Sequence, residues 1–227
     1  DKNLIDKIYI TASGGPFLNT PLNKLKNVNI RQAINHPNWK MGKKISIDSA
    51  TMINKVYEVI EAKNIFNFSY NKIKILIHPK SYVHTMLKFS NGLIKIIAHD
   101  TTMKVPIFNT LFFETNFKLR TNNINLNILN NLNFEEVNLS RYPMVKILKL
   151  LPKKHSLFET VIVSANDTLV NLFLEKKITF LDIHKELFKL IKLNKYSRYK
   201  SIKPKKINDI INLNNYVSTN IRKKYII

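Results

Sequence analysis

The hydrophobic pattern of this chain switches period, and that switch restricts its possible folds more than any other feature. Between residues 73 and 98 the runs IKILI, YVHTMLKF and LIKIIA are rich in β-branched and aromatic side chains, which is typical of strands. The last two runs are joined through Asn91-Gly92, the strongest short signal for a β-hairpin. The sequence therefore predicts an antiparallel meander over residues 73–98.

Helical patterns precede and follow these strands in the sequence. An amphipathic helix is predicted from Ser49 to Asn64, and a second one over Val105–Phe113. Beyond Arg141 the pattern is helical to the end, with Thr179 as the expected N-cap of one helix and apolar residues from Ile207 to Ile221 in the last. We predict an α+β fold class, in which a partial α/β domain with an antiparallel sheet is followed by a C-terminal helical bundle.

A glycine pair marks a constrained point near the start of the chain. A short buried strand is predicted at Ile8–Thr11, and it runs into the turn Ser13-Gly14-Gly15. Two of the four glycines of the chain stand here, which indicates a positive φ or a close backbone approach. The serine hydroxyl and two unhindered N–H groups would also suit a phosphate.

The charge is strongly positive, since 37 Lys and Arg against 15 Asp and Glu give a net charge of +22. Taken alone, this charge predicts an anionic partner such as nucleic acid, a membrane surface or a phosphorylated metabolite. Lys, Asn and Ile are enriched together, as AT-rich codons would make them, and the positive residues are scattered singly or in pairs. We therefore expect no nucleic-acid partner, and a basic nucleic-acid-binding protein is the alternative hypothesis.

Two absences from the sequence restrict the function further. The chain has no Cys, which excludes disulfides, Cys-ligated zinc and thiol catalysis and fits a reducing compartment. No apolar run approaches the roughly 18 residues that a membrane span needs. We therefore expect no membrane partner.

The helix predicted from Ser49 onwards carries the clearest functional pattern. Asp48 and Ser49 are both good N-caps, so the free N–H groups of the first turn would face a ligand. Asn54 and Lys55 lie on the polar face, and a capping hydroxyl, an amide and an ammonium together describe a phosphate site. Glu58, one turn further, would bind a hard cation beside that anion. The alternative is an exposed helix with an ordinary Lys55–Glu58 ion pair.

The loop that precedes this helix has the composition of a lid. Trp39, the only Trp of the chain, and Met41 are large apolar groups among His, Pro, Asn, Lys and Gly. Such a loop would gain by closing over a ligand and excluding water, with Gly42 as its hinge. His36 opens the loop and is the best functional candidate among the six histidines. The alternative is that Trp39 packs on the core.

Several motifs resemble those of one enzyme family. TASGGPF, HPNWKMGKKISIDSATMINK and YEVIEA resemble 1-deoxy-D-xylulose 5-phosphate reductoisomerase, the NADPH-dependent enzyme of the non-mevalonate isoprenoid pathway. The runs ILIHPKSYVH, MKVPI, RYP and SAND support the resemblance, which extends over essentially the whole chain. It implies rearrangement and reduction of 1-deoxy-D-xylulose 5-phosphate to 2-C-methyl-D-erythritol 4-phosphate, with NADPH and Mg²⁺ or Mn²⁺ as cofactors.

The resemblance also implies roles for single residues. Positions that match the family's substrate-binding residues are Ser13, His36, Ser49, Asn54, Lys55 and Glu58. Glu58 also matches one of three carboxylates that hold the metal. Trp39 and Met41 match the flexible flap that closes over the substrate, and Gly42 and Met103 match positions at the NADPH site.

The resemblance further implies an organisation and a set of partners. We predict a catalytic domain at 1–112 that is truncated at its N-terminus, a linker at 113–139 and a C-terminal helical domain at 140–227. The family's Rossmann domain, with two of the metal carboxylates, is missing before Asp1, so the chain alone is expected to be inactive; a non-catalytic remnant is a further alternative. The expected partners are a sugar-phosphate substrate and a second copy bound through the sheet, in the cytoplasm or a plastid-type organelle.

Overall fold

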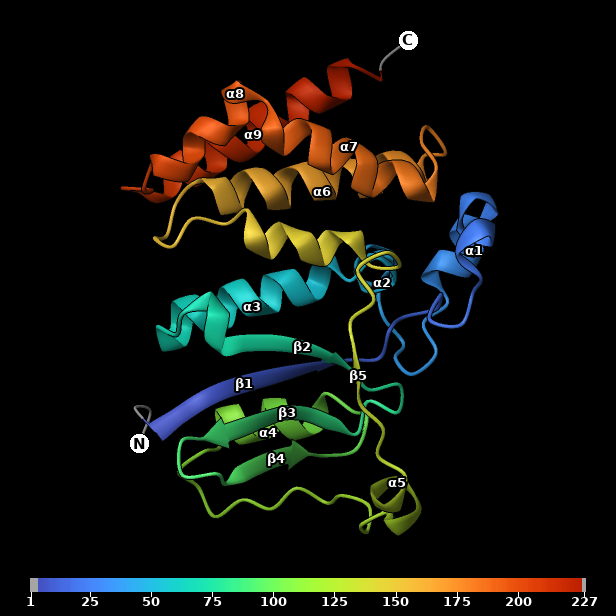
Figure 1. Ribbon diagram of the computed structural model, residues 1–227, viewed down its shortest axis with the longest axis vertical. Coiled ribbons are helices and arrows are strands. Elements are labelled where there is room, and N and C mark those ends of the chain that lie inside the picture. Colours follow the sequence, from blue (N-terminus) through green and yellow to red (C-terminus); the bar gives the residue numbers. More distant parts are fainter. Residues whose placement is uncertain (1–3, 226–227) are drawn as a thin grey trace.

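A computed structural model describes residues 4–225 as a stack of layers, with a mixed sheet at one end and a group of long helices at the other (Figure 1). The sheet has the strand order β4-β3-β1-β2-β5. Its strands are β1 (Ile5–Ala12), β2 (Ile73–Ile77), β3 (Val83–Phe89), β4 (Ile94–Ala98) and β5 (Glu135–Glu136).

The predicted hairpin is confirmed, and the predicted meander is wrong. Strands β3 and β4 pair antiparallel across a turn in which the Phe89 N–H donates to the Leu93 carbonyl at 2.9 Å and Gly92 has a φ of +90°. Strand β1, however, lies between β2 and β3 and pairs in parallel with β2. A turn signal specifies only the two strands that it joins, whereas a parallel pair is set by the packing of the long crossover between its strands.

The helices of the crossover and of the C-terminal part flank this sheet on one side (Figure 1). The helix predicted at Val105–Phe113 is confirmed with slightly different ends. The α-helices are α1 (Ile30–Ile34), α2 (Lys43–Thr51), α3 (Ile53–Phe66), α4 (Lys104–Leu111), α5 (Leu126–Asn130), α6 (Phe158–Leu174), α7 (Phe180–Lys192), α8 (Asn194–Ser197) and α9 (Ile207–Lys223). The 3-10 helices are η2 (Leu22–Asn27), η3 (Tyr70–Lys72), η4 (Pro143–Lys149) and η5 (Arg198–Ser201).

The single helix predicted from Ser49 is two helices. Helix α2 begins at Lys43 and ends at Thr51, and α3 begins at Ile53. Met52 separates them in the left-handed conformation, with a φ of +63°, and its N–H donates to the Ser49 carbonyl at 3.1 Å. A left-handed residue commonly ends a helix, but it is usually Gly. Met52 is 1% exposed and packs with the strands, so tertiary packing holds a conformation that its residue type does not predict.

Two apolar clusters form the core. One contains buried side chains of β1 and β2 together with Met52, Val59 and Tyr142. The other runs from α2 and α3 into the C-terminal helices, and it includes Ile53 and Leu187. Residues 113–139 add strand β5 to the sheet. The division of the chain at 112 and 140 stays a prediction.

The C-terminal helices follow the predicted pattern in part. Thr179 caps α7 as predicted, in a capping box with Asp182. The last helix is also confirmed, but Ile207 at its start is 75% exposed, while Val217 and Ile221 are buried. No helix among residues 4–225 is long and apolar enough to cross a membrane.

Candidate functional site

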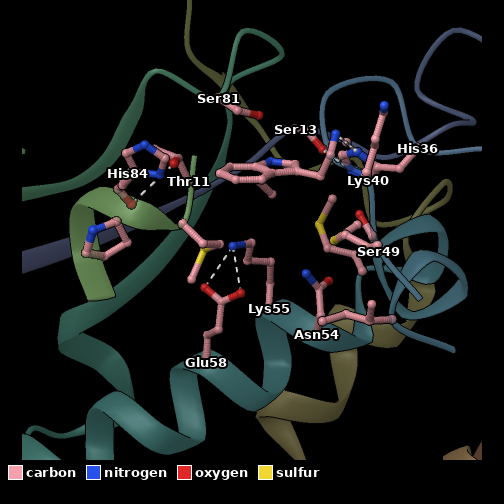
Figure 2. A pocket seen from close by; sticks show the side chains of 18 of the residues that line it. Thr11, Ser13, His36, Lys40, Ser49, Asn54, Lys55, Glu58, Ser81 and His84 are labelled. Carbon is pink, nitrogen blue, oxygen red and sulfur yellow. Dashed lines mark hydrogen bonds and ion pairs between the residues drawn. The ribbon is translucent and has the colours of Figure 1, made fainter. Parts of the chain in front are cut away.

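A cavity of about 560 Å³ lies between the end of β1, the loop at 36–42, the α2–α3 junction and strand β3. Every predicted site residue except Gly42 lines this cavity, and Gly42 is the N-cap of α2 directly after Met41. Figure 2 shows the side chains of Ser13, His36, Ser49, Asn54 and Lys55 gathered around the same hollow. The fold therefore brings residues from four separate stretches of the chain into one pocket.

His36 is held in one tautomer by its neighbours. Its Nδ1 accepts from the backbone N–H groups of Asn38 and Trp39 at 3.2 and 3.0 Å. The proton of the neutral ring must therefore sit on Nε2, which lies 3.0 Å from Oγ of Ser13 and donates to it. Burial, followed by the charge of Lys55, lowers the pKa of His36 and favours this neutral ring.

The Ser13 hydroxyl is left with its proton available. Its oxygen accepts from His36 and also from the backbone N–H of Gly15 at 3.1 Å. Both lone pairs are then used, so the hydroxyl proton is free to be donated to a ligand in the pocket. Gly14 and Gly15 have φ values of +88° and +67°, which confirms the predicted need for glycine in this turn.

The turn packs closely against α2 and the C-terminal part of the chain. A Cβ at Gly15 would lie 2.9 Å from the Ser49 carbonyl oxygen. The buried Tyr142 hydroxyl donates to the Gly14 carbonyl at 2.7 Å, although 128 residues separate the two. Arg141 donates to the carbonyls of Phe17 and Thr20 at 2.7 and 2.6 Å. The RYP motif therefore acts structurally, as a clamp on the loop that begins at Ser13.

The polar end of the pocket differs from the prediction. Ser49 lies in the last turn of α2 and does not begin a helix, so the prediction that Asp48 or Ser49 caps the binding helix is wrong. Asn54 and Lys55 lie in the first turn of α3, which Met52 precedes. The pocket therefore combines a hydroxyl at the end of one helix with an amide and an ammonium at the start of the next.

Lys55 and Glu58 form the ion pair that was the alternative interpretation. The Lys55 Nζ atom lies 2.7 Å from both carboxylate oxygens of Glu58 (Figure 2). The Lys55 side chain is only 16% exposed, and both residues line the cavity. The pair therefore belongs to the pocket and does not lie on an open helix surface.

The side chains that line the cavity provide only part of a binding site for a divalent metal ion. Among residues 4–225, Glu58 is the only carboxylate that lines the cavity, and Lys55 neutralises it. No group of three or more His, Cys, Asp or Glu that could hold a metal occurs within residues 4–225. Mg²⁺ and Mn²⁺ need several oxygen ligands. The described residues therefore do not complete a metal site, and Glu58 would contribute one ligand to it.

Strand β3 and the end of β4 contribute two histidines that the sequence analysis did not select for the site. The rings of His84 and His99 stack with centroids 3.7 Å apart, and both line the cavity. Burial, followed by the charge of His99, lowers the pKa of His84 to about 4, so this ring is neutral near pH 7. Regular pairing counted back from the Asn91-Gly92 turn would set His84 opposite Ala98, and a register shift between Val83 and Thr85, which the sequence does not signal, changes this pairing next to His84. Lys40 also lines the cavity and was not selected.

The loop that carries Trp39 is attached to the turn between β2 and β3. The Asn38 side-chain amide donates to the Pro79 carbonyl at 2.6 Å and to the Ser81 hydroxyl at 2.8 Å. The Trp39 ring meets His84 edge-on, with centroids 6.4 Å apart. Trp39 is half-buried and lies in the wall of the cavity, so it does not belong to the apolar core.

The fold and the pocket together define a mixed α/β protein whose site gathers hydroxyl, amide and ammonium donors, as sites for phosphorylated small molecules do. Two family descriptions match the chain: "1-deoxy-D-xylulose 5-phosphate reductoisomerase C-terminal domain" over residues 1–66 and "DXP reductoisomerase C-terminal domain" over residues 100–219. The chain belongs to the 1-deoxy-D-xylulose 5-phosphate reductoisomerase family.

Similar proteins support this membership over nearly the whole chain. The reductoisomerase of Pelagibacter ubique is 55% identical over 97% of this chain and 57% of its own length. The reductoisomerase of a Sulfurihydrogenibium species is 38% identical over 97% of this chain and 58% of its own length. The chain therefore spans a little over half the length of these relatives.

Solved structures of the same family superpose closely on this chain. A DOX-P reductoisomerase in complex with NADPH, fosmidomycin and magnesium has a TM-score of 0.89 at 30% identity, covering 97% of this chain and 55% of that one. The Zymomonas mobilis reductoisomerase in complex with NADPH has a TM-score of 0.82 at 32% identity, covering 96% of this chain and 55% of that one.

Proposed function

We propose that this chain carries the substrate pocket of a 1-deoxy-D-xylulose 5-phosphate reductoisomerase. The reaction is the rearrangement of 1-deoxy-D-xylulose 5-phosphate and its reduction by NADPH to 2-C-methyl-D-erythritol 4-phosphate. One observation carries the proposal: a single cavity of about 560 Å³ brings Ser13, from the end of β1, together with Ser49, Asn54 and Lys55, from the α2–α3 junction.

These four side chains would hold the phosphate end of the substrate. The Ser13 hydroxyl has a proton to donate, because His36 and Gly15 occupy its lone pairs. Lys55 is mostly buried, so its charge is poorly screened, and it would form charge-assisted hydrogen bonds to phosphate oxygens. His36, held neutral by burial, would orient Ser13 and contact the substrate.

Trp39 and Met41 would close the pocket over the bound substrate and exclude water. Gly42 and Met103 would lie at the NADPH site, and Met103 is 55% exposed at the rim of the cavity. NADPH supplies the hydride when it is bound. The role of this chain's residues there is to hold the sugar phosphate in place and to shield it from solvent.

Glu58 would contribute one ligand to Mg²⁺ or Mn²⁺ once Lys55 turns to the substrate phosphate. The remaining ligands must come from outside the described residues, since no second carboxylate among them lines the cavity. We therefore expect this chain to bind the sugar phosphate and to show no turnover by itself.

Strand β4 supports the proposal of a homodimer. It lies at one edge of the sheet, and its residues are all exposed, including Ile94, Ile96 and Ile97 at 59%, 51% and 50%. An exposed apolar edge strand is a template for pairing with another strand. In sedimentation velocity measurements, Ile96→Glu should convert a dimer into monomers. Lys95→Gln, a change on the same strand that removes no large apolar group, should leave the dimer intact.

Binding of the substrate can be measured through the fluorescence of Trp39, the only Trp of the chain. Titration with 1-deoxy-D-xylulose 5-phosphate should give a saturable change in Trp39 fluorescence. Lys55→Gln should weaken binding roughly tenfold, because it removes a charge-assisted hydrogen bond. Lys63→Gln removes the same charge from the same helix outside the cavity and serves as the control.

Two results would count against this function. One is the absence of a saturable signal, and the other is equal weakening by Lys55→Gln and Lys63→Gln. The predicted absence of a nucleic-acid partner, the domain division and the cytoplasmic or plastid-type location stay predictions.

A further inference from the structure

Helices α2 and α6 meet through a buried polar contact that lies outside the pocket. The Asn166 amide Nδ2 donates to Oδ1 of Asp48 at 2.9 Å. Asn166 is 0% exposed and Asp48 is 2% exposed. The orientation of the amide is settled by the contact itself, since an ionised carboxylate can only accept. A buried hydrogen bond to a charged group is costly to leave unmade, so this contact strongly favours one arrangement of the two helices.

Lys44 binds the second oxygen of the Asp48 carboxylate and also contacts a third helix, α3. Its Nζ lies 2.7 Å from Oδ2 of Asp48 and 2.8 Å from Oδ1 of Asp167. It also lies 5.5 Å from the centroid of the Tyr57 ring on α3. Both oxygens of Asp48 are therefore engaged. We call Lys44, Asp48 and Asn166 the α2–α6 joint.

The joint lies one residue away from the pocket along α2. Ser49 follows Asp48 and lines the cavity, and its carbonyl accepts from the Met52 N–H at 3.1 Å. The same carbonyl packs against Gly15 so closely that a Cβ there would lie 2.9 Å away. Gly15 in turn donates to the Ser13 hydroxyl. A shift of α2 would therefore move Ser49 and disturb the turn that carries Ser13.

An apolar contact would hold α2 to α6 as tightly or more tightly, because burying charged groups costs desolvation energy. A polar contact instead requires a specific register of the two helices, since its hydrogen bonds fail when either helix slides or rotates. The SAND motif at residues 164–167 supplies Asn166 to this register.

We propose that Asp48 and Asn166 are positioning residues, which set the placement of α2 and thereby the geometry of the Ser13 and Ser49 side of the pocket. Neither residue lines the cavity, so their effect passes through α2. The inference rests on the proposed function in one respect, namely that this pocket binds the sugar phosphate.

The first test is ligand binding at a temperature well below unfolding, read by Trp39 fluorescence. Asn166→Ala removes the buried hydrogen bond and should weaken binding of 1-deoxy-D-xylulose 5-phosphate about tenfold. The swapped variant Asp48→Asn with Asn166→Asp rebuilds the hydrogen bond in the opposite direction and should restore affinity to within about threefold of wild type. Asp167→Asn is the control, because it removes a half-exposed partner of Lys44 and leaves the Asp48–Asn166 bond in place; its affinity should not change.

A purely structural role would give a different pattern, in which Asn166→Ala lowers the melting temperature and leaves the affinity of the folded protein unchanged. That result would overturn the proposal. If Asn166→Ala does not fold, the swapped variant decides: a folded protein of near wild-type affinity supports the joint, and loss of folding or of affinity contradicts it.

A second measurement separates this proposal from the proposed function. Amide hydrogen exchange in the ligand-free chain should become faster in Asn166→Ala at residues 13–18 and 43–51 and stay unchanged in α9. If wild type binds no sugar phosphate but this exchange pattern appears, the joint stands and the proposed substrate is wrong. Uniformly faster exchange, or none, would contradict the joint itself.

Discussion

The Nζ atom of Lys55 lies 2.7 Å from both carboxylate oxygens of Glu58, inside the cavity that also contains Ser13 and Asn54. The carboxylate therefore competes with any bound anion for the same ammonium group. In Glu58→Gln that competition is lost, and inorganic phosphate should bind up to about fivefold more tightly, because a partly exposed ion pair contributes about 0.2–1 kcal/mol. Titration calorimetry at low salt measures the change.

The matched control for this prediction is Glu61→Gln, which removes the same charge from an exposed position of the same helix. Equal effects of the two variants would indicate a general change of net charge and contradict a local competition. In an enzyme assembled with all its domains, Glu58→Gln should abolish turnover. Near wild-type activity there at saturating Mg²⁺ would refute the metal role of Glu58.

Gly15 should be far less tolerant of alanine than Gly92. Both have positive φ values, +67° and +90°, so each Ala variant carries a backbone penalty of about 1–2 kcal/mol. At Gly15 the new Cβ would also lie 2.9 Å from the Ser49 carbonyl, whereas nothing lies within 4 Å at Gly92. Urea unfolding should therefore show a greater loss of unfolding free energy for Gly15→Ala, by about 1 kcal/mol or more. Equal losses of unfolding free energy in the two variants would mean that α2 can move away from the new Cβ at no cost.

Tyr142→Phe should destabilise the chain by about 1–2 kcal/mol, because it leaves the buried carbonyl of Gly14 without its donor. Burial raises the pKa of Tyr142 to about 12, so the loss should be the same at pH 6 and pH 9. Urea unfolding at both pH values measures it. Tyr199→Phe removes an exposed hydroxyl that only accepts from Arg198, and it should cost nothing measurable.

His84 should make the stability depend on pH between about 6.5 and about 4. Burial, followed by the charge of His99, lowers the pKa of His84 from 6.5 to about 4 in the folded chain. The unfolded chain therefore takes up this proton first, so the stabilisation is fully present above pH 6.5 and is lost as the pH falls through the folded pKa. Unfolding free energies of wild type should fall more steeply over this range than those of His84→Gln.

Local signals were reliable wherever neighbouring residues decide the structure. The Asn91-Gly92 turn forms the predicted hairpin, and Thr179 caps the predicted helix. The glycine pair after β1 has the positive φ values that its residue types indicate. In each case the interaction closes within a few residues, so the amino-acid types are sufficient evidence.

Predictions from local sequence patterns failed where contacts between residues far apart in the sequence decide the structure. Met52 adopts a left-handed conformation near the start of the helix predicted from Ser49 to Asn64, because its side chain is buried against the strands. Strand β1 lies between two strands that follow it in the sequence by more than sixty residues. His84 and His99 were not selected for the site, although the fold brings both into the pocket wall.

The sequence by itself determined the Thr179 cap, the hairpin, the residue types suited to a phosphate and the family, because these depend on local chemistry and on motifs that occur in order along the chain. Only the tertiary structure decided that Ser49 lies in the last turn of one helix while Lys55 lies in the first turn of the next, and that Tyr142 and Asn166 support the pocket from the C-terminal part. The physical reason is that a buried polar group must find its partner wherever packing has placed one, and residues 118 or 128 positions apart carry no local sign of such a contact.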